Sequence, residues 1–364
     1  MSALERLVED ALRDPFAAAR AHMKKGGRVV GYVGTDIPIE LIAAADCLAL
    51  RLPSFATCAS VAADTYLESK FAPEIVSILE QYLAGTFDFL DAIVLSRADD
   101  SAQRLYYYLS ELRRQQVVQG PQPLIFDLAK IPRSTSRAHT RASTAKLAAE
   151  LGVKAENLPS AIEQCNRRRH LFASLTQLRL GSDAPCGSLV ERIGRAAGLC
   201  DAHTFDAALS DWLAHAPSAG SGPRLVLIGN RPPDDWLHGA VEAAGGGIVA
   251  EWGEQSMFTD DGSLVAAGNT LDDIADHYYG RVAGPRAFLD RAAAVHELAT
   301  AAHADGVIIW VLEQEEAMIW DVPAQMQALQ STGVPVLSLV RRRWDGSDAL
   351  EEIRDFTQRL EKRR

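Results

Sequence analysis

The residues best suited to chemistry stand directly after an apolar segment in the last quarter of the chain. Residues 307–312 form an unbroken run of β-branched and large apolar side chains, and three acids follow it, Glu313, Glu315 and Glu316. Such a run is typical of a parallel strand covered on both faces, and ligands of open α/β sheets gather beyond the carboxyl ends of these strands. Paired acids can transfer protons when burial and mutual repulsion raise one pKa. These acids therefore either mark a site or replace one.

Other polar residues follow predicted strands in the first third of the chain. Glu40 falls in the first turn of a helix that begins near Pro38, where it either complements the helix dipole or serves as a cleft acid. Asp36 is placed to cap that helix. Arg97 and Asp99 lie in a loop that opens another helix, a location suited to anion binding or catalysis. The alternative for Asp99 is a simple helix cap.

The elements that must position these residues alternate between strand and helix. The N-terminal part predicts a helix over 2–23, strands over 28–33, 89–95 and 124–128, and helices over 73–83 and 101–114. Helical periodicity alone fills 138–213, and residues 216–222 are rich in Pro, Gly and Ser. Strands over 225–229, 246–251, 307–312 and 334–340 then alternate with helices.

This pattern predicts an α/β fold with two domains, each a mostly parallel sheet flanked by helices, plus a helical connector. We expect an N-terminal domain over 1–137, the connector over 138–215, a linker over 216–222 and a C-terminal domain over 223–364.

Composition narrows the class of protein. The 364 residues carry a formal net charge of -11, which disfavours nucleic acid or an anionic membrane as the main partner. The first 23 residues lack the apolar core of a signal peptide, and no apolar run is long enough to span a membrane, so a cytoplasmic location is expected. No dinucleotide fingerprint or P-loop lysine follows a predicted strand.

Five cysteines, Cys47, Cys58, Cys165, Cys186 and Cys200, are widely spaced without a CxxC pair. Structural disulfides and a self-contained zinc or iron–sulfur motif are therefore not expected. Cys165 falls in a helical pattern and is predicted to be a buried thiol.

Two basic runs are open to two interpretations. Residues 166–170 read Asn-Arg-Arg-Arg-His within a predicted helix, and Arg341 to Arg343 follow the last predicted strand. Each run either binds a phosphate or forms a solvated surface, and the arginines after the strand could also meet an acidic partner. The solvated interpretation is favoured for both.

The order and spacing of several segments resemble the D-component family of 2-hydroxyacyl-CoA dehydratases, which includes subunits of benzoyl-CoA reductases. The resemblance runs through nearly the whole chain. The segments are Val29-Val30-Gly31-Tyr32, Ile37-Pro38-Ile39-Glu40-Leu41-Ile42, Ala44-Ala45, Leu90-Asp91-Ala92-Ile93-Val94, Ala161-Ile162 with Asn166 and Arg168, Arg224-Leu225-Val226-Leu227-Ile228-Gly229, Ala304-Asp305-Gly306-Val307-Ile308 and Gly333-Val334-Pro335-Val336-Leu337.

The resemblance implies a two-domain subunit of a heterodimer that acts on an acyl-CoA thioester. Members hold a [4Fe-4S] cluster on three cysteines, and an ATP-dependent activator supplies one electron. At the matching positions this chain has Ala72, Ala98 and Glu315. Because alanine cannot ligate iron and one hard carboxylate will not hold a cubane, we expect no cluster or metal at this position.

A different set of thiols would need a new geometry. Cys47 and Cys58 are the ones that could approach the first-domain cleft, whereas Cys186 and Cys200 belong to the connector. We therefore expect no cofactor in this chain.

Two function classes follow. In the favoured one, the chain is the cluster-free subunit of a heteromeric dehydratase or reductase, and a homologous partner subunit bears the [4Fe-4S] cluster. In the other, it is a stand-alone acyl-CoA-binding protein or enzyme that uses Glu40, Arg97, Asp99, Glu315 and Glu316 in a remade cleft.

Overall fold

The computed structural model describes residues 1–57, 60–218, 222–253, 264–266, 268, 270–281 and 289–363. Within these residues the strands form two four-stranded sheets, in the orders β2-β1-β3-β4 and β6-β5-β7-β8, and every pairing is parallel. The predicted α/β class is therefore confirmed. The strands are β1 (Arg28–Val33), β2 (Cys47–Arg51), β3 (Ala92–Ser96), β4 (Gln122–Phe126), β5 (Arg224–Gly229), β6 (Gly247–Trp252), β7 (Gly306–Leu312) and β8 (Val336–Arg342).

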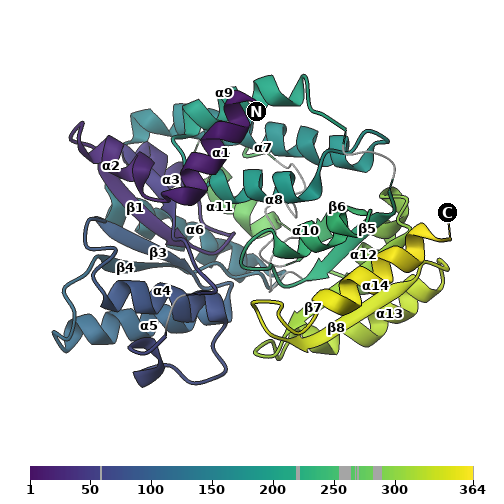
Figure 1. The fold of residues 1–364 in the computed structure, drawn as a ribbon. Helices are drawn as coiled ribbons and strands as arrows, with labels where there is room; N and C mark the ends of the chain where they lie inside the picture. Colours follow the sequence, from purple (N-terminus) through teal and green to yellow (C-terminus); the bar gives the residue numbers. More distant parts are fainter. Residues whose placement is uncertain are drawn as a thin grey trace.

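Helices surround both sheets, which lie beside each other in Figure 1. The α-helices are α1 (Ala3–Arg13), α2 (Ala17–Met23), α3 (Ile39–Ala44), α4 (Pro73–Leu83), α5 (Asp100–Arg114), α6 (Ser134–Leu151), α7 (Leu158–Leu180), α8 (Gly187–Ala196), α9 (Ala202–Leu213), α10 (Trp236–Ala243), α11 (Leu271–Gly280), α12 (Arg291–Ala301), α13 (Val322–Gln330) and α14 (Leu350–Glu361). Short 3-10 helices are η1 (Ala63–Thr65), η2 (Ala155–Asn157) and η3 (Met318–Trp320).

Both faces of the first sheet are covered, because side chains alternate between them along each strand. In β1, Val29 and Val33 pack into the core with α4 and α5, whereas Val30 and Tyr32 face the core that contains α3, α6 and α11. Val30 is 2% and Val29 is 0% exposed. This burial on both faces explains the near-continuous apolar sequence of the strand.

The second sheet is built in the same way. Along β7, Val307, Ile309 and Val311 pack toward α12 and α13, whereas Ile308 and Trp310 pack toward α10 and α14. Every residue of β7 is buried. The prediction of a parallel strand covered on both faces is confirmed, and β7 lies between β5 and β8 in the sheet.

The strand order reverses once in each sheet. The chain leaves β1 for β2 on one side and then crosses to β3 on the other, and it repeats this with β5, β6 and β7. Ligands of open α/β folds bind at such a switch point, beyond the carboxyl ends of the two central strands. The relevant ends are those of β1 and β3 in one sheet and of β5 and β7 in the other.

Three local predictions were wrong. The helix expected over 2–23 divides into α1 and α2, because Pro15 disfavours helical backbone at the preceding Asp14. Strand β2 was not predicted, since Cys47–Arg51 is a short edge strand without a long apolar run. Helix α3 is capped by Pro38, without a side-chain cap from Asp36.

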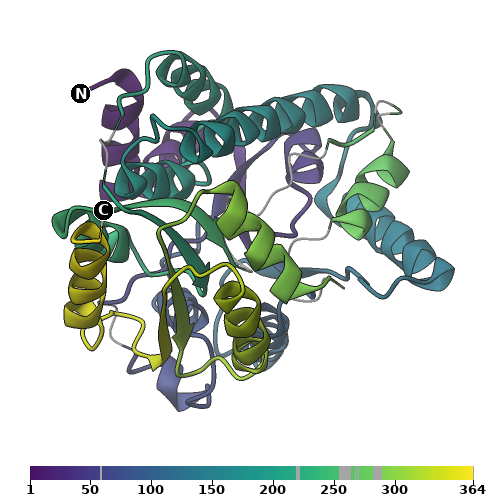
Figure 2. The same cartoon turned by 90° about the vertical axis from the view of Figure 1, so that its right-hand side faces the viewer.

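Helices α7 and α11 connect distant parts of the chain. The 23-residue α7, in teal, runs across the top of Figure 2. Helix α11 packs beside α6, and its Ile274 and Tyr278 belong to the core of the first sheet although they lie in the C-terminal half of the sequence. The predicted domain boundaries stay a prediction. None of the described helices is long and apolar enough to cross a membrane.

Candidate functional site

The ends of the central strands bring together most of the predicted site residues. We use the name strand-end region for residues 70–72, 96–100, 230 and 313–316, which follow or adjoin the carboxyl ends of β3, β5 and β7. The two sheets meet here through Lys70 and Glu316, whose charged groups are 2.7 Å apart. The segment that precedes α4 therefore contacts the segment that follows β7.

Glu315 has a structural task in this region. One carboxylate oxygen accepts hydrogen bonds from the backbone N–H groups of Ala317 and Met318, at 2.9 and 3.1 Å, at the start of η3. The other lies 3.5 Å from the side-chain nitrogen of Asn230, the residue after β5. Asn230 in turn accepts from the N–H of Leu312 at 2.9 Å. Glu315 therefore ties the two central strand ends of the second sheet together.

Glu316 is exposed and surrounded by cations. The hydrogen bond from Lys70 and its charge hold the pKa of the Glu316 carboxyl below its ordinary value, and the more distant charges of Arg341 and Arg104 add to this effect. The Arg104 guanidinium is 3.8 Å from the centre of the Phe71 ring. Glu316 is thus a carboxylate at neutral pH, which suits an ion pair better than a proton donor.

The other candidates of the first sheet also have partners. Asp99 caps α5, because its carboxylate accepts from the N–H of Ala102 at 2.7 Å. Arg97 pairs with Asp127 at 2.5 Å, beyond the neighbouring strand β4. The helix-cap interpretation of Asp99 thus has a direct geometric basis.

The resemblance matches three positions of this chain to cluster cysteines, and two of them are small apolar residues at helix starts. Ala72 is the residue before Pro73, which opens α4, and Ala98 is 1% exposed and precedes Asp99. Neither side chain has a donor atom. These positions, with Glu315, do not fit an iron–sulfur cluster, which requires thiolates.

The described thiols lie elsewhere. Cys47, Cys165 and Cys200 line one cavity at the edge strand β2, and Cys186 precedes α8, 3.2 Å from the Ser188 hydroxyl. Burial raises the pKa of all four, so they are protonated at neutral pH. Among the described residues, no group of three that includes a cysteine brings its ligand atoms within 4.8 Å. Cys58 lies outside the described residues. Cys165, predicted to be buried, is only partly so.

Glu40 lies apart from the strand-end region. It is 0% exposed, and its carboxylate accepts from Arg169 at 2.5 Å and from the Tyr278 hydroxyl at 3.1 Å. Burial pushes the pKa of Glu40 upward, but the charge of Arg169 and the hydrogen bonds outweigh it, so the pKa is below its ordinary value. Glu40 is therefore a buried anion that joins α3, α7 and α11.

The basic run on α7 is largely internal. Arg168 pairs with Asp206 at 2.7 Å and Arg169 with Glu40, while the exposed Arg167 pairs weakly with Glu163 at 3.7 Å. The expected solvated face is thus wrong for the first two, because each arginine meets an acid from a distant element. The other basic run does not follow the last strand as predicted, because β8 extends through Arg341 and Arg342. Arg342 pairs with Glu352 at 2.7 Å, and Arg343, directly after the strand, pairs with Asp345 at 3.2 Å.

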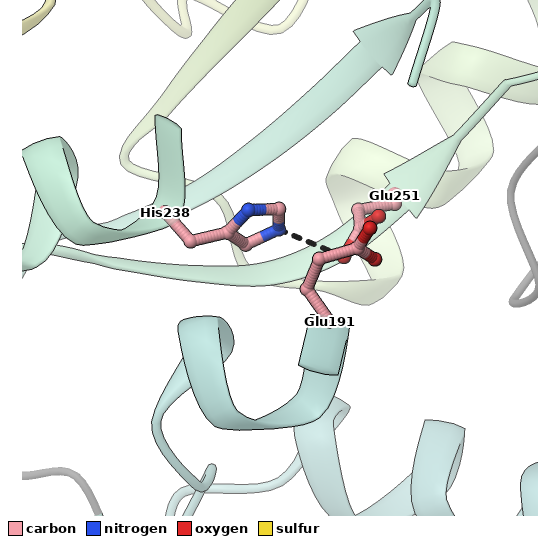
Figure 3. A group of neighbouring side chains, drawn as sticks. All are labelled: Glu191, His238 and Glu251. Carbon is pink, nitrogen blue, oxygen red and sulfur yellow. Dashed lines mark hydrogen bonds and ion pairs between the residues drawn. The ribbon is translucent and has the colours of Figure 1, made fainter. Parts of the chain in front are cut away.

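Sequence analysis missed a buried cluster formed by Glu191, His238 and Glu251. Figure 3 shows the two carboxylates meeting, with the ring of His238 directed at Glu251 at 3.2 Å. Each of the three residues offers one possible metal-ligand atom, and in the described part of the chain these atoms lie within 4.8 Å of one another. Its members are far apart in the sequence, so no spacing motif indicated it.

Guanidinium groups already neutralise this cluster. Glu251 pairs with Arg179 at 2.7 Å, and Glu191 pairs with Arg195 at 2.7 Å and Arg231 at 2.8 Å. Burial and the nearby charge of Arg231 lower the pKa of Arg195 to about 10, a sign of surplus positive charge. A divalent cation would add to that surplus. We interpret the cluster as an ion-pair network.

Comparison with known proteins gives one match. A family model described as 2-hydroxyglutaryl-CoA dehydratase, D-component, matches residues 35–361. The match extends from the loop after β1 to the end of α14 and includes the whole strand-end region. A search of the curated proteins finds no match.

Proposed function

The chain belongs to the 2-hydroxyglutaryl-CoA dehydratase D-component family, and we propose that it is a cluster-free subunit of a heteromeric 2-hydroxyacyl-CoA dehydratase or benzoyl-CoA reductase-like complex. In this proposal a homologous partner subunit with the cluster cysteines carries the [4Fe-4S] redox chemistry, and an ATP-dependent activator serves the complex. This chain shapes the interface and the acyl-CoA channel.

The observation that carries the proposal is the replacement of all three thiol positions by residues that cannot serve as a set of cluster ligands. The side chains of Ala72 and Ala98 have no atom that could ligate iron. In Glu315, one carboxylate oxygen accepts hydrogen bonds at the start of η3, and the other contacts the side chain of Asn230. The surrounding fold is retained, with both sheets and their switch points complete. A retained fold with an absent ligand set is what a non-redox subunit needs.

Acid–base catalysis by the strand-end region has weaker support. Glu316 is held ionised by Lys70, and both Asp99 and Glu315 accept backbone N–H groups at helix starts. A general base or acid needs a pKa near the working pH and a free path to substrate. The stand-alone alternative would therefore rest on binding an acyl-CoA and not on proton transfer.

Anoxic co-purification tests the proposal. The chain, carrying an affinity tag, is expressed alone and together with the cysteine-bearing homologue from its genomic neighbourhood. We expect the homologue to co-elute in a fixed ratio, with iron and sulfide in the complex but not in the chain purified alone. Stoichiometric iron and sulfide in the lone chain, or dehydration of a 2-hydroxyacyl-CoA by it without reductant, would contradict the proposal.

A further inference from the structure

A cavity of about 430 Å³ lies beside the edge strand β2, separate from the strand-end region. It is lined by β1, α3, β2, the first half of α7 and the segment between α8 and α9, whereas Ala72, Ala98, Glu315 and Glu316 are not part of its wall. The volume falls in the range of cavities that bind small organic molecules. The proposed function gives this cavity no task.

Most of its wall is apolar. Ile37 lies just before α3, and Ile39 is the first residue of that helix. Leu48 comes from β2 and Phe172 from α7, and small side chains lie between them, Ala43, Ala49 and Ala197. A cavity with such a wall binds the hydrocarbon part of a ligand, because apolar surface is removed from water on both sides.

The wall also carries charged side chains, the cations Arg51, Arg168, Arg169 and Arg281 and the acids Asp46, Asp201 and Asp206. Tyr32 and Arg51 line the cavity, at 9% and 8% exposure, and the charges of Arg51 and Arg168 act on the Tyr32 hydroxyl. Arg168 is held in place by its ion pair with Asp206 at 2.7 Å. The Tyr32 hydroxyl therefore lies in the part of the cavity wall where the positive charges of Arg51 and Arg168 act.

The Tyr32 hydroxyl makes no hydrogen bond with any residue that the structure describes. The hydroxyl oxygen is not one of the fully buried polar atoms that lack a partner, so it is open to the cavity. Burial of the side chain raises the pKa of Tyr32, so at neutral pH the group is protonated and can donate. The hydroxyl can therefore donate a hydrogen bond to a ligand in the cavity.

We propose that this cavity binds a small organic acid with an apolar body, whose carboxylate accepts the hydrogen bond of Tyr32 and faces Arg51. The hydrocarbon part lies among Ile37, Leu48 and Phe172. The volume of about 430 Å³ suits a small organic acid. The site would thus make the subunit responsive to free acids related to its substrates.

Calorimetry with 4-phenylbutyrate and its neutral counterpart 4-phenyl-1-butanol tests the proposal on the intact chain. We expect the acid to bind, and Tyr32→Phe to weaken it by about tenfold or more, as for loss of a hydrogen bond to a charged group. Tyr107→Phe, at an exposed tyrosine on α5 outside the cavity, is the matched control and should bind normally. Equal binding of the alcohol, or unchanged binding by Tyr32→Phe, would overturn the assignment.

Hydrogen–deuterium exchange gives a second measurement that needs no variant. Strand β2 and the first half of α7 line the cavity, whereas α14 does not. We expect 4-phenylbutyrate to slow backbone exchange in peptides of β2 and of the first half of α7 and to leave peptides of α14 unchanged. Equal exchange with and without the acid would refute the site, and stronger protection by 4-phenylbutyryl-CoA would refute the assignment to a free acid.

Discussion

The carboxylate of Glu40 and the guanidinium of Arg169 form an ion pair of 2.5 Å, although the two residues are 129 positions apart in the sequence. Glu40 is 0% exposed, and the side chain of Arg169 is 9% exposed. The pair is therefore almost wholly removed from water. It joins α3, beside the first sheet, to the long helix α7.

We expect Glu40→Gln to destabilise the protein by about 3–5 kcal/mol, because it leaves the Arg169 charge buried without its counter-charge. Urea denaturation followed by circular dichroism measures this change. The control is Glu163→Gln. Glu163 lies on α7, as Arg169 does, its side chain is 76% exposed, and it pairs with Arg167 at 3.7 Å. Similar losses for the two variants would show that the buried pair has no special contribution.

The same pair predicts how stability depends on pH. The pKa values of Glu40 and Glu251 are both lowered in the folded protein, so their contributions are present above the unfolded carboxyl pKa of about 4.3 and disappear as pH falls toward the folded values. We expect the free energy of unfolding to be nearly constant between pH 7 and pH 5 and to drop steeply below about pH 4. Urea titrations at several pH values measure it, and Glu40→Gln should show a shallower drop.

Glu315 is expected to behave as a capping residue. Glu315→Ala removes the acceptor for two backbone N–H groups and should lower stability by about 1 kcal/mol, whereas Glu315→Gln keeps an acceptor oxygen and should cost less. Glu313→Ala, at the exposed neighbouring acid, is the control. Thermal melts distinguish the three variants. If Glu315→Ala and Glu315→Gln lowered stability equally, the negative charge of Glu315 and not its acceptor oxygen would be responsible.

Chelation tests the interpretation of the Glu191, His238 and Glu251 cluster. Because three guanidiniums already neutralise the two carboxylates, we expect EDTA to leave the melting temperature unchanged and added zinc to give no stabilisation. Differential scanning fluorimetry with and without metal measures both effects. A zinc-dependent rise that disappears in His238→Gln would show that the cluster binds metal.

Elements with a strong local pattern could be predicted from the sequence. Helix α4 begins and ends where expected, since Pro73 marks its start and apolar residues repeat at helical spacing. Strand β7 has an apolar run that only a buried strand of this length explains, and its limits were predicted to within one residue. Helix α5, predicted over 101–114, likewise agrees to within one residue at each end.

Residues whose role depends on distant partners could not be predicted. Arg169 belongs to a basic run that looks like a solvated face, and its acid lies on another element. One local signal did exist, because Glu40 stands between Ile39 and Leu41 in an otherwise apolar helix, where a charge requires a partner. The cluster around His238 left no such signal. Its residues combine only when α8, α10 and β6 pack together.

Helix α7 holds both halves of the molecule with buried charges. Arg169 pairs with Glu40 beside the first sheet, and Arg179, ten residues or about 15 Å further along, pairs with Glu251 of the second sheet. A hinge rotation of one sheet against the other would have to break one of these pairs, at a cost of about 3–5 kcal/mol. Such closing motions are common in two-domain α/β proteins. By pairing with both parts of the molecule, α7 acts as a rigid brace that resists such a rotation.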